Sequence, residues 1–141
     1  MVEVGVDELA RSARAKPFVV VGIPAFNEER TIARVVLEAQ RHADAVVVCD
    51  DGSSDLTCRI AQRLGAVVVR HEQNLGYGAA IKSLFERARE LGADVLVTLD
   101  GDGQHNPDEI PSVAQPVISR EADIAVGSRF IDKRVTAVVP W

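Results

Sequence analysis

Residues 94–105 read DVLVTLDGDGQH, an apolar run of strand length that ends abruptly in an acidic, glycine-rich turn. Almost no polar residue interrupts the run, which is typical of a strand whose two faces are both covered. Four further short runs of this kind occur in the chain. They are 18–23 (FVVVGI), 45–49 (AVVVC), 66–69 (AVVV) and 123–126 (DIAV). We therefore expect five strands.

The stretches between these runs have the apolar spacing of amphipathic helices, with apolar residues three and four positions apart. The three stripes are Ile32, Val35, Val36 and Ala39; Leu56, Ile60 and Leu64; and Ile81, Leu84, Phe85, Ala88 and Leu91. Gly65 and Gly92 follow the second and third stripes, at the position after a helix where a left-handed conformation is favoured. Ser54 or Asp55 is available to cap the second helix.

Strands that alternate with helices predict right-handed β-α-β units and a doubly wound α/β sheet, mainly parallel, with helices on both faces. The chain has 141 residues, 47% of them hydrophobic, which suffices for one domain with one core. We expect residues 17–130 to form that domain, between an N-terminal arm (1–16) and a C-terminal tail (131–141).

Charge and apolar pattern argue against two classes of protein. A net charge of −5 disfavours a nucleic-acid binder, whose contact surface would be basic. No apolar run approaches the roughly 18 residues of a membrane span, and residues 1–16 lack the apolar core of a secretion signal. We therefore expect a cytoplasmic protein in which Cys49 and Cys58 are reduced thiols, since their spacing fits no metal site.

Polar and acidic residues gather directly after the predicted strands. The segments that follow the strands are Pro24–Glu28, Asp50–Asp55, 70–74, Asp100–His105 and Gly127–Arg129. In open α/β sheets, ligands bind beyond the carboxyl ends of the strands. We therefore expect these segments to converge on one site.

The sharpest of these segments is Asp100-Gly101-Asp102-Gly103-Gln104-His105. Its two carboxylates can reach one point where the strand breaks, and the glycines on either side of Asp102 permit this bend. Such hard oxygen ligands suit Mg²⁺ or Mn²⁺, which take further ligands from water and substrate phosphates. An ordinary Asp-Gly turn is the alternative interpretation. A calcium EF-hand is excluded, because the glutamate required at loop position twelve is absent.

The other polar residues leave more than one interpretation open. Asp50 and Asp51 fit a second metal site or a reader of a nucleotide's base and ribose, and equally a turn that leads into the helix at Asp55. Lys82 is either a solvated charge or a phosphate contact. Arg129 is either a surface residue or a partner for a diphosphate.

Three remaining features carry less functional information. Residues 76–82 (GYGAAIK) match neither the dinucleotide fingerprint nor the P-loop spacing, so we interpret their glycines as backbone freedom near the site. We interpret His105 as lying behind the acidic pair, and His71 as incidental.

Taken in order, these segments resemble family 2 glycosyltransferases of the glycosyltransferase-A fold, and most closely the dolichol-phosphate mannosyltransferase and polyprenyl-phosphate glycosyltransferase branch. The matching segments are 23–29 (IPAFNEE), 50–55 (DDGSSD), 74–76 (NLG), 99–105 (LDGDGQH) and 126–130 (VGSRF). The resemblance implies a Rossmann-like fold and a metal held by Asp100, Asp102 and Gln104. The residues that we expect at the substrate are Pro24, Phe26, Glu28, Asp50, Asp51, Lys82 and Gly101. Asp51 would read the base, and Asp100, Asp102 and Arg129 would be catalytic.

The resemblance also implies an activity: inverting transfer of a sugar from a GDP- or UDP-sugar to a polyprenyl phosphate at the cytoplasmic face of a membrane, with Mg²⁺ or Mn²⁺. It leaves a homodimer open. The matched region ends near the end of the chain, so we expect an acceptor-facing half to be missing. The alternatives are a transferase with a glycan hydroxyl acceptor, a nucleotide-sugar-binding module without turnover, and a nucleotidyltransferase, for which residues 24–30 lack the phosphate loop.

Overall fold

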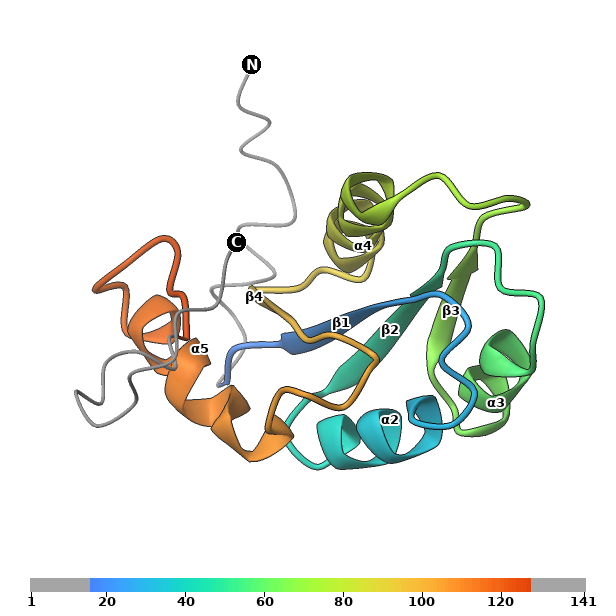
Figure 1. Ribbon diagram of the computed structural model, residues 1–141. Helices are drawn as coiled ribbons and strands as arrows, with labels where there is room; N and C mark the ends of the chain where they lie inside the picture. Colours follow the sequence, from blue (N-terminus) through green and yellow to red (C-terminus); the bar gives the residue numbers. More distant parts are fainter. Residues whose placement is uncertain (1–15, 128–141) are drawn as a thin grey trace, which may run out of the picture.

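A computed structural model describes residues 16–127, which form one twisted sheet with helices on both faces (Figure 1). The strands are β1 (Val19–Ala25), β2 (Ala45–Asp50), β3 (Val67–Arg70) and β4 (Val95–Thr98). The helices are α2 (Ile32–Gln40), α3 (Thr57–Arg63), α4 (Tyr77–Glu90) and α5 (Ile110–Ile118), with the 3-10 helix η1 (Pro107–Glu109) directly before α5. The predicted α/β class, with helices on both faces, is confirmed.

The four strands are parallel and lie in the order β3-β2-β1-β4. The chain adds β2 and β3 on one side of β1 and then crosses to place β4 on the other side. This reversal makes the carboxyl ends of β1 and β4 the topological switch point, where α/β sheets open a crevice for ligands.

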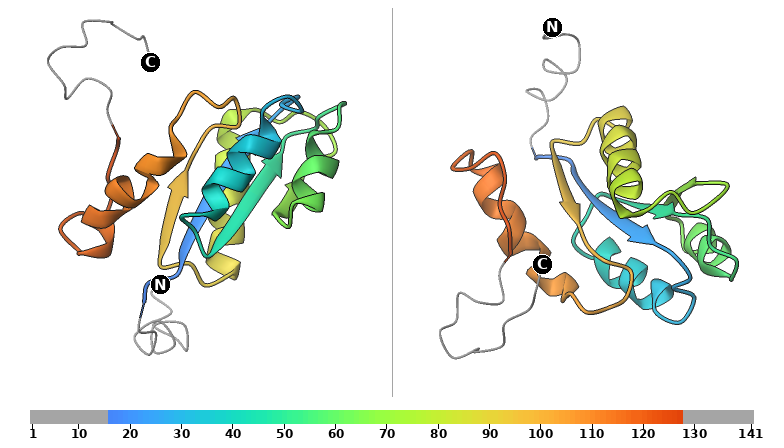
Figure 2. Two further views of the ribbon diagram at one scale, coloured as in Figure 1. Left: turned by 90° about the horizontal axis from the view of Figure 1, so that it is seen from below. Right: turned by 45° about the horizontal axis from the view of Figure 1, so that its top comes forward.

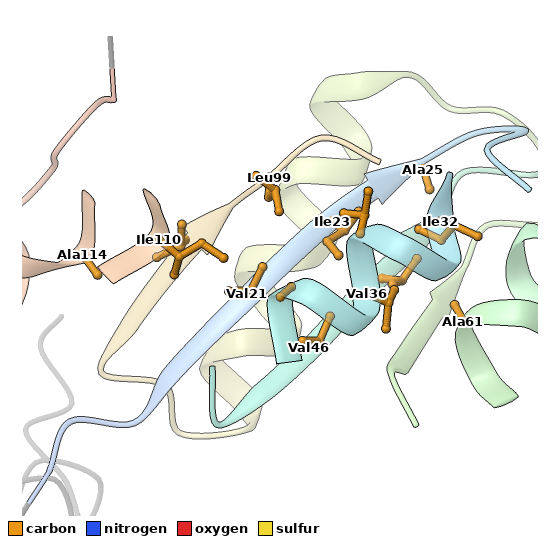
Figure 3. Close-up of a cluster of buried hydrophobic side chains, with 14 of the residues drawn as sticks. Val21, Ile23, Ala25, Ile32, Val36, Val46, Ala61, Leu99, Ile110 and Ala114 are labelled. Carbon is orange, nitrogen blue, oxygen red and sulfur yellow. The ribbon is translucent and has the colours of Figure 1, made fainter. Parts of the chain in front are cut away.

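Helices cover the two faces of the sheet unequally (Figures 1 and 2). Of the helices within residues 16–127, α2, α3 and α5 pack against one face and α4 packs against the other. Alternate residues of β1 pack on opposite faces of the sheet, because successive side chains of a strand point in opposite directions. Val21 and Ile23 lie in the cluster with Val36 and Ile110 (Figure 3), whereas Val20 packs on the side of α4.

The predicted helices form, but two of their apolar stripes are partly wrong. The stripe of α2 is fully buried, and Gly65 and Gly92 take the expected positive φ angles of 86° and 76°. In contrast, Leu56 is 53% exposed and Phe85 is 59% exposed. The buried faces lie elsewhere on these helices: they centre on Thr57, Cys58 and Ala61 in α3 and on Ala80, Leu84 and Ala88 in α4. Both cysteines are unpaired and buried.

The predicted strand at 123–126 does not form. The segment follows α5 without pairing to the sheet in the described part of the chain, and its apolar residues Ile124 and Val126 are 82% and 71% exposed. An apolar run becomes a strand only where a neighbouring strand accepts its backbone hydrogen bonds, and no local pattern shows whether that neighbour exists.

No helix within residues 16–127 is long and apolar enough to cross a membrane. The predicted arm (1–16), apart from its last residue, and the predicted tail (131–141) lie outside the described residues.

Candidate functional site

A pocket of about 400 Å³ lies at the switch point between β1 and β4. The carboxyl ends of β1, β2 and β4 and the first turn of α4 supply its walls. Its lining residues are Pro24, Ala25, Phe26, Glu28, Asp51, Asn74, Gly76, Tyr77, Ala80, Asp100, Gly101 and Asp102. Most of the site residues expected from the sequence therefore meet at one place.

Four of the expected residues are not in this pocket. Asp50 is fully buried beneath the turn that follows β2, where it accepts the Ser53 amide at 3.1 Å. Lys82 is exposed on α4. Gln104 lines a neighbouring hollow of about 260 Å³, and Arg129 lies outside the described residues.

The loop after β1 is held by the loop after β2. Asn27 donates its amide to Ser53 Oγ at 2.9 Å, and its own side-chain oxygen accepts the Ser54 amide at 2.9 Å. One residue further on, Glu28 donates its amide to Thr57 Oγ1 at 2.8 Å. Asn27 takes a positive φ of 51°, which asparagine tolerates better than most residues. These reciprocal bonds fix the wall that carries Phe26 and Glu28.

Asp55 completes this connection at the start of α3. Its carboxylate accepts the amide of Thr57 at 2.9 Å and that of Glu29 at 3.2 Å. Burial acts to raise the pKa of the Asp55 carboxyl, but the hydrogen bonds from Thr57 and Glu29 outweigh it and hold the pKa below its usual value. The prediction of Ser54 or Asp55 as the N-cap of α3 is therefore wrong, because Leu56 occupies the cap position. Asp55 lies one residue before it and accepts the amide of Thr57, the first residue of the helix.

Because its pKa is lowered in the folded state, Asp55 contributes stability that is present above its unfolded pKa and is lost as pH falls through the folded value. We expect Asp55→Asn to lower the urea midpoint near neutral pH, and the difference from the parent to shrink below about pH 4. Urea titrations at both pH values measure this. Asp123→Asn removes an exposed carboxylate and is the control. A difference for Asp55→Asn that does not change with pH would contradict the interpretation.

The Asp51 carboxylate holds the loop after β3 beside the pocket by accepting two of its backbone amides. Its Oδ1 accepts the Leu75 amide at 2.8 Å, and its Oδ2 accepts the Gly76 amide at 2.9 Å. His71 Nδ1 lies 2.7 Å from the same Oδ1. Burial acts to raise the pKa of Asp51, but the bonds from His71, Leu75 and Gly76 outweigh it and lower the pKa. Asp51 is therefore a carboxylate that both lines the pocket and shapes it.

The interpretation of His71 as incidental is wrong. Its side chain is only 10% exposed, and its Nε2 lies 2.8 Å from Ser83 Oγ on α4. The sequence carried one usable signal, because His71 is the first residue after β3 and so lies at the carboxyl edge of the sheet.

Two exposed aromatic side chains stand at the pocket. Phe26 is 46% exposed and follows β1, and Tyr77 is 64% exposed and begins α4. Burial and the nearby charge of Asp100 raise the pKa of the Tyr77 hydroxyl. Tyr77 did not emerge from the sequence as a site residue, because a tyrosine beside two glycines has no distinctive spacing. Aromatic faces of this kind suit stacking against a planar ring.

The acidic pair follows β4 and lines the same pocket. Thr31 Oγ1 donates to the carbonyl of Gly101 at 2.6 Å and so anchors the turn between the two carboxylates. A side chain at Gly101 would place its Cβ 3.3 Å from the Pro24 carbonyl oxygen, so a glycine suits the position. His105 Nδ1 lies 3.7 Å from Asp100 Oδ2, where we expected this imidazole.

The oxygen atoms of Asp100 and Asp102 fit a divalent cation whose coordination shell the protein fills only in part. Within the described residues, no group of three His, Cys, Asp or Glu side chains is placed to hold a metal. Asp100 and Asp102 supply hard oxygen atoms at the rim of the pocket. Mg²⁺ and Mn²⁺ are commonly bound by one or two carboxylates, with phosphate and water completing the coordination. The residues present fit such an ion together with a phosphate-bearing ligand.

Comparison with known proteins gives consistent matches. The profile of "Glycosyl transferase family 2" matches residues 20–141. The UDP-N-acetylglucosamine--dolichyl-phosphate N-acetylglucosaminyltransferase of Methanococcus voltae is 40% identical over 126 residues, covering 77% of this chain and 50% of that protein. The polyprenol monophosphomannose synthase of Mycolicibacterium smegmatis is 31% identical over 147 residues, covering 99% of this chain and 55% of that protein.

A solved structure resembles the fold. Glucosyl-3-phosphoglycerate synthase from Mycobacterium tuberculosis, in complex with Mn²⁺, UDP-glucose and phosphoglyceric acid, superposes with a TM-score of 0.61 at 28% identity. The match covers 86% of this chain and 46% of that one. The chain thus spans about half the length of the relatives that it matches.

Proposed function

Since this chain belongs to glycosyl transferase family 2, we propose that it binds a nucleoside-diphosphate-sugar in the pocket between β1 and β4 and forms the donor half of a sugar transferase. The observation that carries the proposal is the composition of that one pocket. It combines a carboxylate suited to a base, two exposed aromatic rings and an acidic pair suited to a metal diphosphate. Residues 17–130 form the donor-binding domain in this proposal.

The pocket has the size and polarity that such a donor needs. Its volume of about 400 Å³ lies in the range of small-molecule sites. The Asp51 carboxylate accepts a hydrogen bond from the base, and the rings of Phe26 and Tyr77 stack against it. Asp100 and Asp102 hold Mg²⁺ or Mn²⁺, with Gln104 next to them. When bound, the cation stabilises the negative charge that develops on the departing nucleoside diphosphate.

The donor that we propose is a UDP-sugar. The Methanococcus voltae relative is named for a UDP-sugar donor, and the similar Mycobacterium tuberculosis structure contains UDP-glucose and Mn²⁺. Asp51 supports the same choice, because its Oδ2 accepts the Gly76 amide and can accept one further donor from the pocket.

The acceptor that we propose for the whole protein is a polyprenyl phosphate at the cytoplasmic face of a membrane. In this proposal Arg129 binds either the donor diphosphate or the acceptor phosphate. Two relatives are named for dolichyl-phosphate or polyprenol acceptors. A phosphate monoester has a second pKa of about 6, so at neutral pH it is mainly a dianion and attacks without a general base. Transfer of labelled sugar by the full-length protein to a short polyprenyl phosphate tests this. Transfer to 3-phosphoglycerate or to a glycan hydroxyl instead would overturn it.

Donor binding is testable with the chain itself. Calorimetric titration with UDP, with and without Mn²⁺, is expected to give binding at least about tenfold tighter with the metal, because the cation links the acidic pair to the diphosphate. Pyrophosphate with Mn²⁺ is the control that lacks a base, and it is expected to bind more weakly than UDP. If neither UDP nor GDP binds under any of these conditions, the proposed function is wrong.

A further inference from the structure

His71 lies behind the pocket and does not line it. Its backbone follows β3, and its amide donates to the carbonyl of Asp50 at 2.9 Å. Its imidazole spans from Asp51 Oδ1 at 2.7 Å to Ser83 Oγ at 2.8 Å, with Cys49 Sγ 3.7 Å from Nε2. The ring therefore connects a pocket carboxylate to the buried side of α4.

The direction of the bond to Asp51 is fixed by chemistry. A carboxylate only accepts hydrogen bonds, so His71 Nδ1 carries the proton and donates it, whether the ring is neutral or charged. The second ring nitrogen is held by Ser83, which prevents the ring from turning away. The imidazole is thus a fixed donor to one oxygen of Asp51.

The lone pairs of Asp51 can be counted. A carboxylate offers about four acceptor sites, two on each oxygen. Oδ1 accepts from His71 and from the Leu75 amide, which fills that oxygen. Among the described residues 16–127, Oδ2 accepts one hydrogen bond, from the Gly76 amide. Asp51 lines the pocket with one acceptor site remaining, on a single oxygen.

We propose that His71 is a positioning residue that makes Asp51 a single-acceptor reader and thereby selects a uracil base. The inference rests on the proposed function, because it assigns a role within the same nucleotide pocket. The uracil edge presents one N3–H donor between two carbonyl oxygens, which one remaining lone pair can accept. The guanine edge presents two adjacent donors, N1–H and N2–H, which require both oxygens of a carboxylate. With Oδ1 filled by His71, Asp51 cannot accept that pair.

The first test uses the unaltered chain and modified ligands, so it carries no risk of misfolding. We expect UDP with Mn²⁺ to bind at least about tenfold more tightly than GDP with Mn²⁺, and N3-methyl-UDP to lose a similar factor, because a charge-assisted hydrogen bond is left unmade. Equal binding of UDP and N3-methyl-UDP would overturn the proposal. If UDP binds but GDP binds equally well, the selection of uracil and the choice of a UDP-sugar as donor are refuted, while binding of a nucleoside-diphosphate-sugar in this pocket stands.

The second test separates positioning from a general loss of structure. In His71→Asn the amide nitrogen occupies the place of Nδ1 and can donate to Asp51, whereas in His71→Gln the amide reaches the place of Nε2 near Ser83. We expect His71→Asn to retain the preference of UDP over GDP, and His71→Gln to reduce it at least about threefold, because Oδ1 of Asp51 then has a free acceptor site. Thermal midpoints report folding separately. The same preference in both variants would contradict the role of His71.

Discussion

Asp102→Asn is expected to remove the Mn²⁺-dependent part of UDP binding and to leave metal-free binding within about twofold of the parent. Asp102 lines the pocket beside Asp100, and within residues 16–127 no group of three His, Cys, Asp or Glu side chains is placed to hold a metal. Loss of groups that merely support metal ligands costs about 10–100-fold in metal affinity, so loss of a direct ligand is expected to cost at least as much. Calorimetry with UDP at several Mn²⁺ concentrations measures the effect.

Asp108→Asn is the matched control for this prediction. It also removes one carboxylate close to the acidic turn, but Asp108 pairs with His42 at 2.9 Å and does not line the donor pocket. We expect Asp108→Asn to keep the Mn²⁺ enhancement. If Asp102→Asn keeps the enhancement as well, the assignment of the metal to this pair is wrong, and the turn is an ordinary Asp-Gly turn.

Gly52→Ala, in the turn after β2, is expected to lower the free energy of unfolding strongly. Gly52 has a φ of 79°, and an added Cβ would lie 2.5 Å from the backbone carbonyl carbon of Gln73 and 2.6 Å from the amide nitrogen of Asn74. The left-handed conformation costs a non-glycine residue about 1–3 kcal/mol, and forcing the backbone apart adds about 1–3 kcal/mol more. Urea unfolding measures the sum.

Gly65→Ala separates the two contributions. Gly65 has a similar φ of 86°, but the nearest atom to its Cβ would be Gln40 Nε2 at 3.9 Å. It therefore carries only the backbone cost, and we expect it to lose about 1 kcal/mol or slightly more. The clash at Gly52 displaces the loop that donates its amides to Asp51, so only Gly52→Ala is expected to weaken UDP binding as well. Equal losses of stability in the two variants would contradict the tight contact.

The position of the acidic pair was predictable because it follows directly from chain order. A strand must end where its apolar run ends, and parallel strands bring their carboxyl ends to one edge, so Asp100 and Asp102 were expected beside Pro24 and Phe26. The structure places these four residues around one pocket.

Chain order does not predict whether Asp50 or Asp51 faces the pocket. Adjacent residues at a strand end face opposite ways, so only one of Asp50 and Asp51 can reach the pocket, and the pattern does not say which. In the structure Asp50 is fully buried, with Arg70 Nε 3.6 Å from its Oδ2, and Asp51 lines the pocket.

The alternation of strands and helices, the α/β class and the edge of the sheet that carries the site were all predictable from the sequence. They depend on residue periodicity and chain direction, which are local properties. The order β3-β2-β1-β4, the exposure of 123–126 and the contact between His71 and Asp51 became known from the folded chain. That contact depends on the register that pairs Asp50 with Arg70 across β2 and β3. Register is set by packing between segments distant in the chain, and no local pattern specifies it.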